Sequence, residues 1–185
     1  MRKNLGVKPL IMPQPVLIVA TYDENGKPNA MNVAWGGMCA ANEIMLCLSA
    51  HKSTENIEKT KAFTVSVANS EKIVACDYVG IASAKDTPDK MERAGFTVTK
   101  SEFVNAPVIN ELPLCLECEL KEVLPGGKYI GEIKNVSLCE CGFTDGAPDT
   151  AKIDPVVCDP LGHGYYKLGD RVGDAFKSGF ALKND

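Results

Sequence analysis

Apolar and polar residues alternate along short stretches of this chain, and such a period of two predicts strands with one buried face. Before residue 70 the stretches are 16–21, 30–39, 44–49 and 62–68; after it they are 97–99, 114–123, 129–139 and 156–157. Turn-forming residues separate several of them, with Asn25-Gly26 after the first and Pro125-Gly126-Gly127 between two long ones. Strands joined in chain order by short turns predict an antiparallel barrel.

Other stretches have the spacing of helices. One helix is predicted to start where Ser53 or Thr54 can cap it and to run to about Thr60. Two more cover 70–84 and 86–94, the latter ended by Gly95, and residues 165–180 predict a closing strand followed by a helix. Strands and helices do not alternate as a doubly wound sheet requires. We therefore expect one mainly β domain over residues 1–185, a barrel with helical additions.

The composition is ordinary for a soluble globular protein, with 45% hydrophobic and 24% charged residues among 185. A net charge of −4 provides no positive surface for nucleic acid, so no such partner is expected. Prolines interrupt the apolar part of residues 1–15, and no later apolar run approaches the length of a membrane span. These features predict a cytoplasmic protein with no membrane partner.

Reduced thiols are expected at the eight cysteines, because no export signal precedes them and most lie in apolar stretches. They are Cys39, Cys47, Cys76, Cys115, Cys118, Cys139, Cys141 and Cys158. The Cys115–Cys118 spacing is that of a redox or metal pair, but on a strand the two thiols point to opposite sides, which favours a structural role. Cys139 and Cys141 share a face, yet no second pair completes a zinc site, so no metal is predicted.

Common nucleotide and hydrolase motifs are missing from the sequence. There is no P-loop, no glycine-rich dinucleotide fingerprint after a strand, and no G-x-S-x-G elbow. The chain has only two histidines, His51 and His163, and a serine or cysteine hydrolase would need one of them as its base. No third group is visibly fixed beside either, which disfavours that class.

The turn His51-Lys52-Ser53-Thr54 is the strongest candidate for binding chemistry. Two hydroxyls, a lysine and the free N–H groups of a helix start can together hold a phosphate. The alternative is an ordinary capped surface helix, and Glu55 directly after the hydroxyls would oppose an anion.

The single tryptophan, Trp35, is the second candidate. A lone tryptophan is more often part of a core than a shelf for a ligand. Gly36 and Gly37 follow it, and glycines allow a planar ligand to approach the backbone closely.

Several motifs in order along nearly the whole chain resemble the flavin reductase-like domain family, which includes flavoredoxin and the small reductase components of two-component monooxygenases. They are Met12-Pro13-Gln14-Pro15-Val16, residues 32–35, residues 51–56, Ser83-Ala84-Lys85-Asp86 with Asp89-Lys90 and Ala94-Gly95, Ile130-Gly131-Glu132-Ile133, and Gly164-Tyr165-Tyr166-Lys167-Leu168-Gly169. Residues 83–86 replace a more usual Ser-Gly-Arg-Asp. Where family members have a histidine after residues 130–133, this chain has Asn135 or Ser137.

The resemblance implies an FMN-binding split β-barrel of antiparallel, Greek-key type that forms a homodimer, with the flavin near the subunit interface. By position in the motifs, the expected cofactor-binding residues are Asn32, Ala34 and Trp35 along the isoalloxazine, Ser49, Lys52, Ser53 and Thr54 around the ribityl phosphate, Lys90 approaching the flavin, and Tyr166 in the closing aromatic motif. Taken alone, Lys90 would be an ordinary solvated helix charge.

The resemblance further implies an FMN-dependent oxidoreductase. Reducing equivalents would pass from NAD(P)H through the flavin to an acceptor, which is free flavin, a partner redox protein or a monooxygenase. Because the flavin carries the chemistry, no side chain is assigned as catalytic. The alternatives are a flavoredoxin-like electron carrier with little direct NAD(P)H activity and a flavin-binding protein without turnover.

Overall fold

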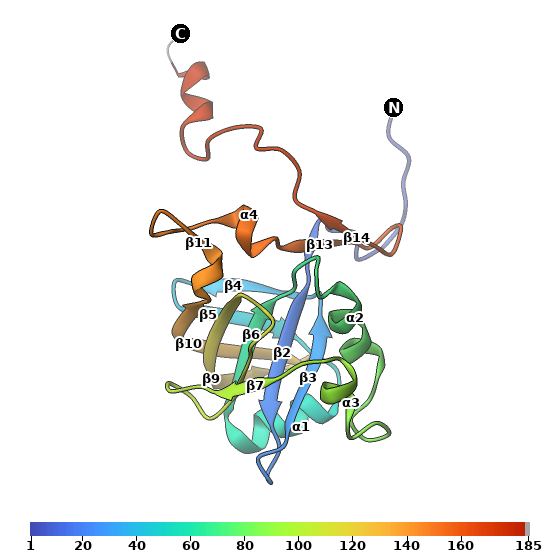
Figure 1. Ribbon diagram of the computed structural model, residues 1–185. Helices are drawn as coiled ribbons and strands as arrows, with labels where there is room; N and C mark the ends of the chain where they lie inside the picture. Colours follow the sequence, from blue (N-terminus) through green and yellow to red (C-terminus); the bar gives the residue numbers. More distant parts are fainter. Residues whose placement is uncertain (184–185) are drawn as a thin grey trace.

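Seven antiparallel strands form the main sheet of the computed structural model, which describes residues 1–183 (Figure 1). Their order across the sheet is β3 (Pro28–Val33), β2 (Leu17–Tyr22), β6 (Ala62–Val67), β9 (Leu114–Leu124), β10 (Lys128–Leu138), β5 (Glu43–Cys47) and β4 (Gly36–Ala40). The first and last strands of this order, β3 and β4, are separated in the chain only by Ala34 and Trp35. The sheet therefore curls until its two edges meet at one corner.

Smaller elements surround this sheet. One small sheet contains β1 (Gln14–Pro15), β13 (Val156–Asp159) and β14 (Gly164–Lys167), and two pairs are β7 (Val98–Lys100) with β8 (Pro107–Ile109) and β11 (Phe143–Thr144) with β12 (Ala147–Pro148). The helices are α1 (Lys52–Thr60), α2 (Ile73–Ile81), α3 (Lys90–Arg93) and α4 (Thr150–Ile153), with 3-10 turns η1 (Glu140–Gly142) and η2 (Ser178–Leu182). Across residues 1–183, the helices are too short or too polar to traverse a bilayer.

The alternation of residues in β2 divides the core between two faces. Leu17 and Val19 belong to a cluster with Phe63 and Tyr129, which fills the concave interior of the sheet. Ile18 and Ala20 belong to a second cluster formed by α2, α3 and the segment up to β8. Both faces of β2 are therefore buried, and α2 and α3 lie along the flank of β3 (Figure 1).

The interior cluster is tightly packed where β10 passes β6. A Cβ placed on Gly131 of β10 would collide with the Phe63 ring and would lie 3.3 Å from the Cβ of Cys118. Phe63 itself has no exposed surface. Glycine is therefore required at residue 131 for the ring to occupy the interior.

The predicted antiparallel, mainly β architecture with helices is confirmed, with corrections to several elements. The strand expected over 30–39 is two strands, because the chain leaves one edge of the sheet at Val33 and enters the other at Gly36. The helix expected over 86–94 contains only Lys90–Arg93, since Pro88 disfavours helical backbone at Thr87. The helix expected over 70–84 begins at Ile73.

The α-helix expected within 165–180 is also absent from the described chain; β14 is followed by a segment without regular secondary structure, a turn over 175–177, and then η2. A short helix depends on packing its apolar face, and here Val172 and Phe176 are almost fully exposed. Figure 1 shows this C-terminal arm and the N-terminal arm projecting from the same end of the molecule.

The expectation of eight reduced thiols is wrong for one pair, because Cys139 and Cys141 form a disulfide. The predicted strand over 129–139 ends at Leu138, and the chain then turns into η1, which brings the two Cα atoms to 5.3 Å, within the range of a disulfide. Cys115 and Cys118 are both free thiols and both buried, which agrees with the structural role expected for them.

Candidate functional site

The candidate site is built around the start of α1. Its first helical residue is Lys52, and the preceding residue, His51, has extended backbone. The Thr54 hydroxyl accepts a hydrogen bond from the His51 N–H at 2.9 Å and donates one to the His51 carbonyl at 2.8 Å. The prediction that Ser53 or Thr54 occupies the cap position is therefore wrong, because Thr54 reaches back from the first turn. The first N–H groups of a helix have no acceptor within it, so this end favours an anion.

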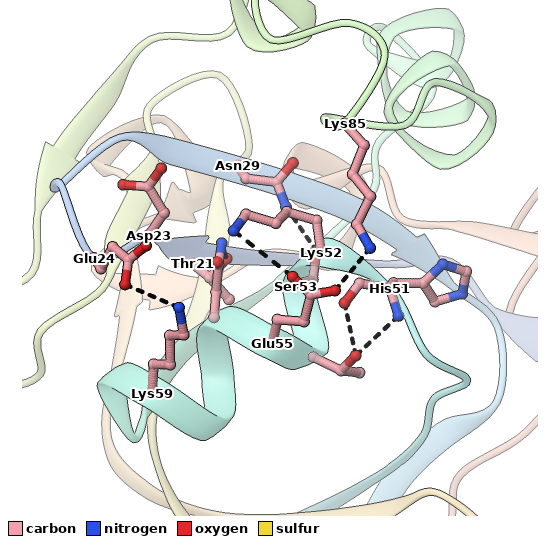
Figure 2. A network of polar contacts seen from close by, with 12 residues as sticks. Thr21, Asp23, Glu24, Asn29, His51, Lys52, Ser53, Glu55, Lys59 and Lys85 are labelled. Carbon is pink, nitrogen blue, oxygen red and sulfur yellow. Dashed lines mark hydrogen bonds and ion pairs between the residues drawn. The ribbon is translucent and has the colours of Figure 1, made fainter.

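A cavity of about 260 Å³ opens beside this helix end, between β3 and the C-terminal end of α2. Its lining residues come from four segments and are Asn29, Met31, Asn32, His51, Lys52, Ser53, Val79, Gly80, Ile81, Ala82, Ser83, Ala84 and Lys90. Figure 2 shows Asn29 of β3 reaching toward Ser53, with Lys52 beside it. Four of the predicted site residues, Asn32, Lys52, Ser53 and Lys90, thus meet at one cavity although they come from three separate stretches of the sequence.

Asn29 provides a polar group that the sequence analysis missed. Its side-chain N–H donates to the Ser53 hydroxyl at 2.8 Å, and both residues are buried. The other amide atom, Asn29 Oδ1, is buried without a hydrogen-bond partner among the described residues. Such an acceptor is costly unless a ligand or water supplies a donor. An asparagine after a turn has no distinguishing pattern, so no signal in the sequence marked it.

Lys90 is the most deeply buried cation at the cavity, with 4% of its surface exposed. Its ammonium donates to the carbonyls of Val79 at 3.1 Å and Ala82 at 2.9 Å, which are among the free carbonyls at the end of α2. Removal from water lowers the pKa of this amine to about 8. Lys90 therefore ties α3 to α2 and places a titratable charge at the cavity, unlike the solvated lysine that its sequence context alone suggests.

Glu55, whose negative charge would oppose a bound anion, forms ion pairs with two lysines. Its carboxylate lies 2.7 Å from the Lys85 Nζ and 3.8 Å from the Lys52 Nζ (Figure 2). The hydrogen bond from Lys85 is the main reason that the pKa of Glu55 is lowered. Lys85 stands where the resembled family more often has arginine, and in this chain it forms an exposed ion pair with Glu55.

A second cavity of about 150 Å³ adjoins the first and shares Asn29, Lys52, Ala84 and Lys90 with it. It adds Lys27 and Asn56, so three lysines line it together with a single carboxylate, Asp23. The region on both sides of Asn29 is therefore suited to an anionic ligand that also carries hydroxyl groups.

The other predicted site residues lie elsewhere. Ala34 and Trp35 line an apolar hollow of about 360 Å³ together with Pro9, Ile11, Pro13, Gln14, Pro15, Gly36 and Cys47, and Trp35 is 54% exposed. The Ser49 hydroxyl is 2.8 Å from Nε2 of His51. Thr54 is buried in the helix start, and Tyr166 is exposed on β14.

Gly80 allows α2 to approach β3, because a Cβ on it would lie 2.8 Å from the Cβ of Asn32. We expect Gly80→Ala to push α2 outward and to disturb the bond from the Asn32 amide to the Cys76 carbonyl, now 3.2 Å. Overpacking of about 1–3 kcal/mol exceeds the helix-propensity gain of about 1 kcal/mol, so the free energy of unfolding should fall. Urea denaturation measures this, with Gly169→Ala as control because open space surrounds that glycine. Equal stability of the two variants would contradict the expected clash.

The family model described as "Flavin reductase like domain" matches residues 10–158. The flavoredoxin of Desulfovibrio vulgaris (Miyazaki F) is 36% identical, with a TM-score of 0.91 over 97% of this chain and 100% of that one. The flavoredoxin of Methanosarcina acetivorans is 29% identical, with a TM-score of 0.86 over 98% of each chain. An FMN-binding domain of a flavin reductase-like enzyme from Shewanella baltica, at 19% identity, shares the fold, with a TM-score of 0.75 over 87% of this chain and 89% of that one. The predicted split β-barrel is confirmed.

Proposed function

The chain belongs to the flavin reductase-like domain family, and on this premise we propose that it binds FMN and passes reducing equivalents from NAD(P)H through the flavin to an acceptor. The observation that carries the proposal is the cavity at the start of α1, where Lys52, Lys90 and the unpartnered Asn29 Oδ1 come together. The acceptor is proposed to be free flavin, a partner redox protein or a monooxygenase.

The residues present fit FMN chemically. Its phosphate requires cations and N–H donors, which Lys52 and the start of α1 offer. Its ribityl hydroxyls can donate to Asn29 Oδ1. Its flat ring system suits apolar side chains such as Met31 and Ile81. We assign Ser53 to the phosphate end with these groups.

The remaining assignments are carried by the family alone. We propose that Asn32, Ala34 and Trp35 contact the ring, that Ser49 and Thr54 support the phosphate loop, and that Tyr166 closes the site. Ser49 would act through His51, to which it is hydrogen-bonded, and Thr54 through the helix start that it holds.

The bound flavin would supply the hydride chemistry, and this chain's residues would bind and orient it. Lys52 and the helix start hold negative charge at one end of the cavity. Lys90, which donates to two carbonyls, keeps a third ammonium hydrogen for the ligand and favours additional negative charge nearby. No side chain is proposed as a nucleophile or as a general acid.

A flavoredoxin-like electron carrier with little direct NAD(P)H activity is the second candidate. It is favoured by the matches to two flavoredoxins along almost the full length of the chain. A flavin-binding protein without turnover is the third.

One anaerobic experiment separates the reductase from the other two candidates. The purified protein is loaded with FMN, excess flavin is removed, and NADH or NADPH is added while flavin absorbance near 450 nm is followed. We expect a yellow protein whose colour is bleached within seconds. Colour that persists with both nicotinamides but bleaches with dithionite favours the carrier, and failure to retain or bind FMN contradicts the whole proposal.

FMN affinity should depend on pH through Lys90. The pKa of Lys90 is about 8, so the free protein loses this positive charge as pH rises above 8. Above that pH, the protein must therefore take up a proton at Lys90 when it binds an anion. We expect the Kd for FMN to be constant from about pH 7 to 8 and to rise by up to about tenfold per unit above it. Fluorescence titration at constant ionic strength measures the profile. A flat profile to pH 9.5, or the same slope in Lys90→Met, would contradict this role.

We further propose that the chain forms a homodimer. Trp35 and Met38 are more than half exposed beside an edge strand, and Val172, Phe176 and Leu182 project on the C-terminal arm. Such apolar surface is typical of an interface. Light scattering coupled to size exclusion should give twice the monomer mass, and a monomeric peak at micromolar concentration would contradict the proposal.

We also propose, from the sequence alone, that the protein is located in the cytoplasm.

A further inference from the structure

The disulfide between Cys139 and Cys141 encloses a single residue, Glu140, at the point where β10 ends and η1 begins. A bond that closes so short a loop removes much less conformational freedom from the unfolded chain than one that joins distant segments. It also connects no two elements that the backbone does not already connect. The disulfide is therefore expected to add little to the stability of the fold.

The backbone around the pair is held without help from sulfur. The N–H of Cys139 donates to the Pro113 carbonyl, and the N–H of Gly142 donates to the Cys139 carbonyl, each at 2.9 Å. A third bond of the same length joins the N–H of Asp149 to the Gly142 carbonyl. This segment has the contacts to stay in place whether the two sulfurs are bonded or reduced.

The pair is also open to reagents, in contrast to three of the six other cysteines. Cys141 is exposed and Cys139 half-buried. Cys76, Cys115 and Cys118 are buried, and desolvation raises the pKa of their thiols to about 12, 11 and 12. Thiolate chemistry is therefore suppressed inside the barrel and confined to surface sulfurs.

We propose that Cys139 and Cys141 form a two-electron dithiol/disulfide centre that exchanges with small dithiols in solution. A thiolate of the dithiol attacks one sulfur, which breaks the Cys139–Cys141 bond and forms a mixed disulfide. The second thiol of the reductant then displaces the protein sulfur. The reductant leaves as a cyclic disulfide, and its two electrons and two protons remain on the cysteines as two thiols. This centre does not involve FMN. A result that refutes FMN binding would therefore leave this proposal unchanged, and the reverse is also true.

Redox equilibration of the folded, full-length protein tests this centre. The protein is incubated in mixtures of reduced and oxidised dithiothreitol, quenched with acid and labelled with a maleimide, and the labels are located by peptide mass spectrometry. We expect two additional labels, on Cys139 and Cys141, after reduction, and the same labelled fraction whether equilibrium is approached from reduced or oxidised protein. Circular dichroism should be unchanged throughout.

Two variants identify the cysteines that give the dithiothreitol-dependent labelling. Cys39→Ser removes an exposed free thiol elsewhere and should keep the two reducible sulfurs, whereas Cys141→Ser should lose all dithiothreitol-dependent labelling because Cys139 then has no partner. Sulfurs that stay free under oxidising conditions overturn the proposal. A bond that opens only when denaturant is present overturns it equally.

Discussion

Lys90→Met should weaken FMN binding by about 10- to 100-fold, the loss expected when a charge-assisted hydrogen bond of about 1.5–3 kcal/mol is removed. Methionine retains the length and apolar stem of the side chain, so the substitution mainly deletes the ammonium group. Fluorescence titration measures the change in Kd. We also expect a more negative flavin midpoint potential, since a cation near the site favours the added negative charge of the reduced state.

The matched control is Lys85→Met, which removes the same charge from an exposed lysine outside the lining of the cavity. It should change the Kd for FMN less than about threefold, because exposed pairs contribute little. Lys90→Met will also lower the free energy of unfolding, since the Val79 and Ala82 carbonyls lose their donor. Circular dichroism at the titration temperature must therefore show a folded protein. A folded Lys90→Met protein with the affinity and midpoint potential of the original would refute the role of this residue.

Gly131→Ala should produce the largest loss of stability. A Cβ at this position would enter the space of the Phe63 ring at the centre of the barrel, and neither β6 nor β10 can move freely because each pairs with strands on both sides. Overpacking of this kind costs about 1–3 kcal/mol. Urea denaturation, followed by far-UV circular dichroism, should show a lower midpoint with an unchanged slope.

A double variant separates steric conflict from other effects of replacing glycine. Phe63→Leu alone should destabilise the protein by leaving a cavity, but combined with Gly131→Ala it should relieve part of the clash, so that the two effects are not additive. Gly37→Ala is the control within the same sheet, because nothing lies within 4 Å of a Cβ there. Strict additivity of Phe63→Leu and Gly131→Ala would show that the two residues do not compete for space.

Local sequence patterns predicted some residues of the candidate site and missed others. Residues 51–54 were recognisable because a lysine and hydroxyls at a helix start have a direct chemical meaning, and Lys52 and Ser53 do line the cavity. Asn29 was not recognisable, although it lies against Ser53, because the two residues are 24 positions apart and meet only through the packing of α1 on β3. The burial of Lys90 was equally impossible to predict, since a lysine in a short segment with Asp89, Glu92 and Arg93 has the pattern of an exposed helix.

Period-two alternation and turn chemistry are local properties, so the amino-acid sequence was enough to predict most of the long strands and the turns at Asn25-Gly26 and Pro125-Gly126-Gly127. The division of residues 30–39 at Ala34 and Trp35 depends on the whole sheet, since β3 and β4 lie at its two opposite edges and meet only when the sheet curls. The same holds for the Cys139–Cys141 bond, which depends on the bend after Leu138. The position of Lys90 beneath the end of α2 is likewise set by long-range packing, because burial and the partners of a charge are decided by segments that the local sequence does not contain.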